Sequence, residues 1–215
     1  MSQLSYVHRG GEPPLIGVPI HRYFSGVARR FPDNEAVVSL WQGKRRTYEE
    51  LMAEVEELAR GLLALGVERG QRVGVWATDN LEWILLQLAT AQVGAVLVNI
   101  NPAYRIAELE HALSAARVNV LFLMPAFKKS HYVQMVRELC PELEAPCPER
   151  LRCHRLPELS HVVVFDPEDV AATERPAPGF LVWNEVLDRG RAVSDDALRS
   201  REQDLDCDDP INIQF

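Results

Sequence analysis

Three cysteines and a histidine fall close together in the sequence, and these residue types could hold a zinc ion. They are Cys140, Cys147, Cys153 and His154, at spacings of C-x6-C and C-x5-C-H. Structural zinc sites generally use tighter C-x2–4-C pairs, which place two thiolates on one turn. The wider spacing and the neighbouring prolines favour plain loop thiols, and zinc binding stays open as the alternative.

The turn after the first buried strand is where a dinucleotide-binding fold would hold phosphate. Such a turn needs glycines, so that backbone amides can approach the pyrophosphate. Residues 77–83 read ATDNLEW, without glycine and with Asp79, whose carboxylate would repel a phosphate. Thr78, Asp79 and Asn80 can cap the helix that follows, and we interpret Asp79 as such a cap. The sequence also lacks the G-x-S-x-G, H-E-x-x-H and P-loop motifs.

The remaining candidates are three histidines and an acidic run. His21, His111 and His131 lie within expected helices, and none has a serine, cysteine or carboxylate at a spacing that indicates a catalytic triad. The run Asp195–Asp209 could bind a cation, but it lacks the D-x-D-x-D-G order of a calcium loop, which favours a solvated linker. From the residues alone we assign no catalytic, cofactor-binding or metal-binding residue.

Composition and charge narrow the class of protein. The 215 residues are 47% apolar and 25% charged, which is ordinary for a globular protein. The net charge of −8 argues against nucleic-acid binding, because a phosphate backbone would be repelled. The first residues lack the apolar core of a secretory signal, so we expect a cytoplasmic protein whose four cysteines are reduced.

One stretch without charged residues, between Glu82 and Arg105, raises the question of a membrane span. A spanning helix needs about 20 consecutive apolar residues. Glutamine, threonine, glycine, asparagine and proline interrupt this run. We therefore expect a buried helix followed by a buried strand, and no transmembrane segment.

The elements that must position any site alternate between helical and strand periodicity. Thr47 and Glu50 have the form of a capping box, and an apolar stripe at helical spacing follows as far as Gly66. Along the whole chain, the spacing of apolar residues predicts a hairpin at 35–48. It predicts helices at 20–31, 47–65, 80–93, 106–117, 130–139 and 180–190. It predicts strands at 72–77, 95–99, 118–124, 161–165 and 211–215. The alternating order predicts an α/β fold with a mostly parallel sheet flanked by helices.

Stretches that lack helical or strand periodicity indicate the domain organisation. We expect a flexible lead-in at 1–14 and one incomplete α/β domain at 15–215. Proline-rich stretches predict surface loops at 140–159 and 166–179, and the density of acids predicts an acidic linker at 194–210.

Several motifs, in their order and spacing, resemble the N-terminal portion of the acyl-adenylate-forming enzymes, and the acyl-CoA synthetases in particular. The likeness covers roughly residues 18–125 and resumes at Asp208–Phe215, and it is strongest to the medium-chain and fatty acyl-CoA synthetase branch. The residues that carry it are Thr47, Tyr48, Glu50 and Leu51, then Gly66, Val67, Gly70 and Val73, then Asn80, Glu82 and Trp83, then Gly94-Ala95 and Asn101-Pro102.

The resemblance implies a reaction for the full-length parent enzyme. A fatty or other carboxylic acid attacks the α-phosphate of ATP, giving an acyl-adenylate, and coenzyme A then displaces AMP. Magnesium and cationic side chains would stabilise the phosphate charge. In such enzymes the strand at Asp208–Phe215 leads into a Thr/Ser/Gly-rich loop that holds the phosphates of ATP, and this sequence stops before it. We therefore expect a catalytically incomplete segment with no bound cofactor.

A second hypothesis is a stand-alone α/β module that uses the same scaffold to bind a partner protein. Under the first hypothesis part of the apolar surface would lack its covering sequence, which allows a homo-oligomer. The second predicts a monodisperse fragment that melts cooperatively. The sequence alone leaves the acyl chain length open.

Overall fold

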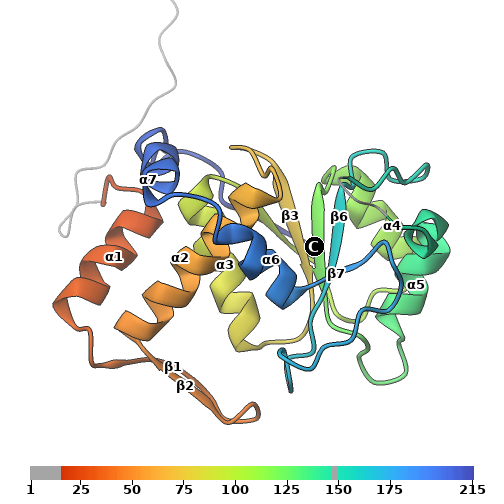
Figure 1. Cartoon of the computed structure of the whole chain (residues 1–215), viewed down its shortest axis with the longest axis horizontal. Coiled ribbons are helices and arrows are strands. Elements are labelled where there is room, and N and C mark those ends of the chain that lie inside the picture. The colour runs from red at the N-terminus through yellow and green to blue at the C-terminus, as the bar shows by residue number, and fades with distance from the viewer. Residues whose placement is uncertain (1–15, 147–149) are drawn as a thin grey trace, which may run out of the picture.

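A six-stranded parallel sheet forms the centre of the molecule, and helices cover both of its faces (Figure 1). The computed structural model describes residues 16–146 and 150–215. The lead-in expected at 1–14 therefore lies outside the described residues, as does Cys147. Each neighbouring pair of strands in the sheet is parallel, which confirms the α/β class and the mostly parallel sheet.

The order of the strands is β7-β6-β5-β3-β4-β8. Their bounds are β3 Arg72–Trp76, β4 Val96–Asn99, β5 Val120–Leu123, β6 His161–Val164, β7 Leu181–Val182 and β8 Asn212–Gln214. A separate antiparallel hairpin, β1 at Glu35–Ser39 and β2 at Lys44–Thr47, precedes the sheet. Strands β4, β5 and β6 are buried along their whole length, as continuous apolar runs covered on both faces must be.

Helices divide between the two faces of the sheet. The bounds are α1 Ile20–Arg30, α2 Tyr48–Ala64, α3 Leu81–Val93, α4 Ile106–Ala115, α5 Tyr132–Leu139, α6 Trp183–Gly190 and α7 Asp195–Gln203. One core packs α2, α3 and α6 against the sheet, and a second packs α4 and α5 against the other face. Side chains of β5 alternate between the cores, with Phe122 in the first and Leu121 in the second, because successive strand residues point to opposite faces.

The start of α2 shows how local sequence sets these elements. The hydroxyl of Thr47 accepts a hydrogen bond from the amide of Glu50 at 3.3 Å, and the Glu50 carboxylate accepts one from the amide of Thr47 at 2.9 Å. The predicted capping box is thus confirmed. The apolar stripe behind it is buried, and each large side chain contributes about 1.5–3 kcal/mol of transfer free energy. Gly66 takes a φ of +77° just after the helix, as a left-handed turn requires.

Helices α2 and α6 approach each other at two glycines. A Cβ atom on Gly190 would lie 2.6 Å from the amide nitrogen of Gly61, and a Cβ on Gly61 would lie 2.7 Å from the carbonyl oxygen of Val186. Neither position has room for a side chain, so the two helix backbones are in direct contact there.

The structure corrects the prediction for 140–159. We expect a surface loop from its prolines, but the segment covers the second core. A short 3-10 helix at Pro141–Glu144 begins it, and its apolar side chains, Leu143, Leu151, Leu156 and Leu159, are at most 3% exposed. Burial of apolar side chains therefore holds this irregular segment in place.

The prediction of an acidic linker at 194–210 is also wrong in part. Ser194 caps a helix there by accepting from the amide of Ala197, and Leu198 of this helix is buried in the first core. Segment 166–179, by contrast, contains no helix or strand. Strand β7, which the sequence does not predict, follows it. In 16–146 and 150–215, no helix combines the length and the apolar character needed to cross a bilayer.

Candidate functional site at the carboxyl edge of the sheet

The strand order points to one place where a ligand site would be expected. From β3 the chain moves to β4 on one side, and then crosses to β5 on the other side. Doubly wound sheets bind ligands where this order reverses, outside the carboxyl ends of the strands. Here that point lies between β3 and β5, beside residues 77–80 and 124–130.

The turn after β3 faces the turn after β5. The Thr78 hydroxyl lies 3.8 Å from the Met124 sulfur. Asn80 caps α3, because its side-chain oxygen accepts from the amide of Trp83 at 2.7 Å. The interpretation of Asp79 as the cap is therefore wrong: Asp79 is exposed, and its carbonyl oxygen accepts from the Trp41 indole at 3.0 Å.

The hairpin β1–β2 supplies polar side chains to this edge of the sheet. Lys44 Nζ donates to Glu82 Oε1 at 2.6 Å and to the carbonyl oxygen of Pro167 at 3.2 Å. The Gln42 amide donates to Glu82 Oε2 and to the same carbonyl, each at 2.9 Å. Its oxygen accepts from the amide of Leu81 at 2.8 Å. The charged and polar groups of Gln42, Lys44 and Glu82 are thus all engaged in hydrogen bonds within the chain.

Sequence reasoning does not identify this cluster, although Glu82 gives a signal. It is the last charged residue before a long uncharged stretch, and its side chain is 4% exposed. A carboxylate buried in an apolar helix needs a cationic partner. The sequence does not show that the partner is Lys44, because 38 residues separate the two.

This edge does not fit a nucleotide phosphate. Neither turn contains a glycine that would bring amides close to an anion, and Asp79 and Glu82 place two carboxylates beside the turn after β3. Lys128 and Lys129 follow β5 and are exposed, and Lys128 Nζ lies 4.9 Å from the centre of the Phe127 ring. Ser160 Oγ lies 3.0 Å from His161 Nδ1, but this buried pair is at the amino end of β6, away from this edge, and the same hydroxyl donates to the carbonyl oxygen of Asn119 at 2.8 Å.

The three histidines are not brought together. His111 and His131 are exposed, whereas His21 is 5% exposed. Neither ring nitrogen of His21 has a hydrogen-bond partner among the described residues. Burial lowers the pKa of His21 below its ordinary value of 6.5; nearby Glu202 opposes this shift, and Arg22 adds to it.

We expect His21 to make folding sensitive to mild acid. Below about pH 6.5 the unfolded chain binds a proton at this histidine, while the folded chain stays neutral until its lower pKa is reached. The free energy of unfolding therefore keeps its full contribution from neutral His21 above about pH 6.5. It decreases as the pH falls from 6.5 toward the lower pKa of His21 in the folded chain. Urea unfolding at pH 7.5 and pH 5.5 measures the loss. His21→Phe should reduce this pH dependence, and an unchanged dependence in that variant would refute the assignment.

Two of the four cysteines, Cys140 and Cys153, lie side by side, with Cα atoms 5.5 Å apart, a separation at which a disulfide can form. The expectation that all four cysteines are reduced stays a prediction. A carboxylate oxygen of Glu142 lies within 4.8 Å of both sulfur atoms, and a disulfide between the two cysteines would remove the thiolates that zinc would need. The side chain of His154 is exposed, and its backbone amide donates to Glu142 at 3.0 Å.

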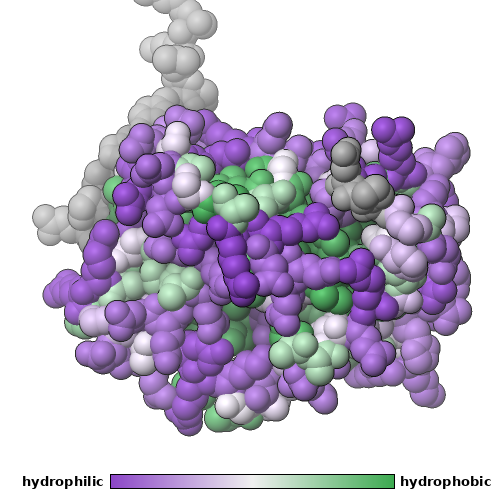
Figure 2. All heavy atoms as spheres, viewed as in Figure 1, coloured by the Kyte–Doolittle hydropathy of each residue, from purple (hydrophilic) through white to green (hydrophobic). Residues whose placement is uncertain are grey.

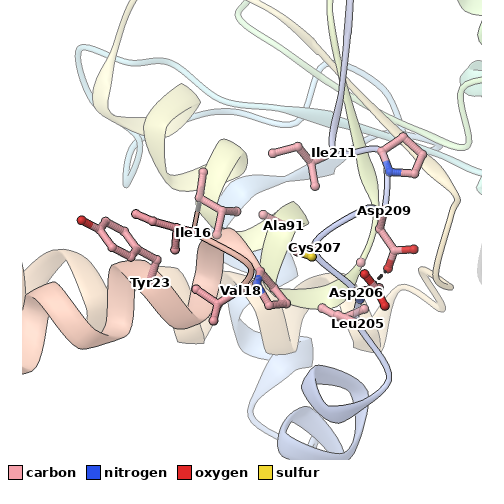
Figure 3. Close-up of a pocket in the computed structure, with 13 residues that line it drawn as sticks. Ile16, Val18, Tyr23, Ala91, Leu205, Asp206, Cys207, Asp209 and Ile211 are labelled. Carbon is pink, nitrogen blue, oxygen red and sulfur yellow. Dashed lines mark hydrogen bonds between the residues drawn. The ribbon is translucent and has the colours of Figure 1, made fainter. Parts of the chain in front are cut away.

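A small pocket lies where the acidic run passes the start of α1 (Figure 3). Its volume is about 270 Å³, and apolar side chains, including Ile16, Val18 and Ile211, form much of its lining. Its carboxylate Asp209 accepts from Arg69 at 2.7 Å, and this contact lowers the pKa of Asp209. A hydrogen bond with Asp206 raises the pKa of the Cys207 thiol, which makes it a poor nucleophile at neutral pH.

Comparison with known proteins identifies the family. The sequence profile described as "AMP-binding enzyme" matches residues 24–215. The chain belongs to the AMP-binding enzyme family. This agrees with the resemblance to acyl-adenylate-forming enzymes seen in the motifs.

The relatives of this AMP-binding enzyme chain include acyl-CoA ligases. "Medium-chain acyl-CoA ligase ACSF2, mitochondrial" of Danio rerio is 38% identical over 98% of this chain, and the human protein of that name is 38% identical over 99%. "Putative acyl-CoA synthetase YngI" of Bacillus subtilis is 31% identical over 94%. This chain covers 34%, 33% and 35% of their respective lengths, so it spans about a third of these relatives.

Solved structures share the fold. The N-terminal domain of FACL13 from Mycobacterium tuberculosis superposes with a TM-score of 0.60 over 93% of this chain and 41% of that domain, at 20% identity. A putative long-chain-fatty-acid CoA ligase of Rhodopseudomonas palustris gives a TM-score of 0.62 over 79% of this chain and 36% of that one, at 22% identity. The fold of this chain thus matches part of the N-terminal domain of an adenylate-forming enzyme.

Proposed function

We propose that this chain is scaffold for an acyl-CoA ligase of the AMP-binding family, and that the whole protein activates a medium-chain or fatty acid. ATP, magnesium and coenzyme A are the cofactors of the proposed reaction, in which an acyl-adenylate forms and is converted to a thioester. The observation that supports this most strongly is the identity of 38% to medium-chain acyl-CoA ligases across almost all of the chain.

We also propose that residues 1–215 are inactive alone. Beside the edge of the sheet where a ligand site would be expected, the polar groups of Gln42, Lys44 and Glu82 are engaged in contacts within the chain. No described residue there provides a cradle for phosphate. This chain would then contribute a rigid sheet and packed helices, against which the nucleotide-binding part of the ligase is positioned.

Exchange of radiolabelled pyrophosphate into ATP tests both proposals. We expect the product of the complete reading frame that contains this chain to catalyse exchange with a medium-chain fatty acid. We expect the 215-residue chain at the same concentration to show none. Exchange by the 215 residues alone would refute the scaffold role, and failure of the complete product with a panel of aliphatic and aryl acids would refute the ligase activity.

A further inference from the structure

Exposed apolar side chains gather in a groove between the hairpin and α3. Val38 is 42% exposed, Leu40 82%, Trp41 53% and Ile84 38%. All four line one groove of about 760 Å³, and among its described lining residues only Asp79 is charged. Apolar side chains also gather at the lower end of the molecule in Figure 2, where Figure 1 places the hairpin. A contiguous apolar surface with few charges is typical of the centre of a protein interface.

Specific contacts fix the hairpin, one wall of this groove, to the start of α3, the other wall. The Trp41 indole donates to the carbonyl oxygen of Asp79, and Gln42 accepts from the amide of Leu81. The Lys44–Glu82 ion pair fixes the tip of the hairpin, where β2 begins, to the first turn of α3. The hairpin therefore cannot fold down onto α3 to bury Leu40 without breaking these contacts. A surface preorganised in this way loses little conformational freedom when a partner binds.

One lining residue of the groove contacts the edge strand of the sheet. Gln87 lines the groove, and its side-chain oxygen accepts from the Asn212 amide of β8 at 3.0 Å. Strand β8 pairs with β4 on one side, and within the described sheet its other side has no partner strand. An unpaired edge with main-chain donors and acceptors accepts a further strand. One segment of polypeptide could thus pair with β8 and place apolar side chains in the groove.

The length of the relatives indicates what covers this surface. The ligases that match almost all of this chain are about three times as long, so most of such a protein lies outside it. A second copy of this chain is a poorer occupant, because each copy carries a net charge of −8 and two copies repel. We propose that the β8 edge and the hairpin groove are an intramolecular interface, covered by the part of the longer ligase that this chain does not contain. This inference rests on the proposed function.

Residue-resolved hydroxyl-radical footprinting tests the interface. We compare the 215-residue chain with the product of the complete reading frame. In the shorter chain Leu40 and Trp41 should react readily, as their exposure requires, and in the longer protein their oxidation should fall severalfold. Phe31, which is 41% exposed and lies outside the groove, provides the control. Equal oxidation of Leu40 in the two proteins would overturn the proposal.

Two matched variants extend the test. Leu40→Glu should lower the melting temperature of the longer protein and leave that of the 215-residue chain nearly unchanged, whereas Phe31→Glu should have the same small effect in both. No selective effect of Leu40→Glu in the longer protein would contradict the interface. Protection of Leu40 that increases with the concentration of the 215-residue chain would identify a second copy as the occupant and overturn the proposal. Protection in a longer protein that lacks ligase activity would support the interface and refute only the proposed function.

Discussion

Replacing Lys44 with methionine should destabilise the chain by about 3 kcal/mol, because the variant leaves a buried carboxylate without its cation. The Glu82 side chain is 4% exposed and has Lys44 and the Gln42 amide as donors. In Lys44→Met only the neutral amide remains. The side chain of Lys44 is 23% exposed, so some water reaches the site, which places the expected loss at the lower end of the range for buried pairs. Urea unfolding followed by far-UV circular dichroism measures it.

Two further variants separate the ion pair from simple packing. In Lys44→Met combined with Glu82→Leu the buried charge is absent, and we expect much of the lost stability to return. Arg45→Met removes one partner of an ion pair with Glu35 whose side chains are 62% and 56% exposed, and it should change stability by less than about 1 kcal/mol. If Lys44→Met were as mild as Arg45→Met, the cluster would not hold the hairpin as described.

The second large effect is expected at the contact of α2 with α6. Gly190→Ala adds a Cβ 2.6 Å from the amide nitrogen of Gly61 and 3.0 Å from the carbonyl carbon of Arg60. These are backbone atoms, which cannot rotate away, so α6 must shift. Overpacking of this kind costs about 1–3 kcal/mol and sometimes more. The melting temperature and the urea midpoint should both fall.

Gly26→Ala is the matched control for this glycine substitution. Gly26 is exposed in α1, and an added Cβ there meets nothing within 4 Å. Alanine is favoured over glycine inside a helix by about 0.5–1 kcal/mol, so this variant should be slightly more stable than the parent. A loss at both positions would mean that the helix contact is not the cause.

The regular elements of the fold could be predicted because their signals are local. The capping box at Thr47 and Glu50 and the apolar stripe behind it identify α2, and continuous apolar runs identify the buried strands. Helix α7 could not be found in this way. It is rich in charged residues, and Leu198 is the one member of the helix that is buried. Strand β7 has only two residues, too few to show a period of two.

The contents of the candidate site could not be predicted, because they depend on contacts between distant residues. Gln42 contacts Pro167 across 125 positions, and Lys44 contacts Glu82 across 38. Nothing in the spacing of these residues indicates their proximity. The absence of a glycine-rich turn after β3, by contrast, is a property of seven consecutive residues, so the sequence alone can argue against a phosphate cradle at that turn.

The position of β8 beside β4 has a consequence for biosynthesis. Asn99 of β4 contacts Asn212 of β8, and 113 residues separate them. A ribosome that adds about 5–20 residues per second needs roughly 6–23 seconds to synthesise that interval. During this time β4 has left the ribosome, and the edge that later pairs with β8 has no partner strand. We expect nascent-chain chaperones to bind this edge until β8 has been synthesised.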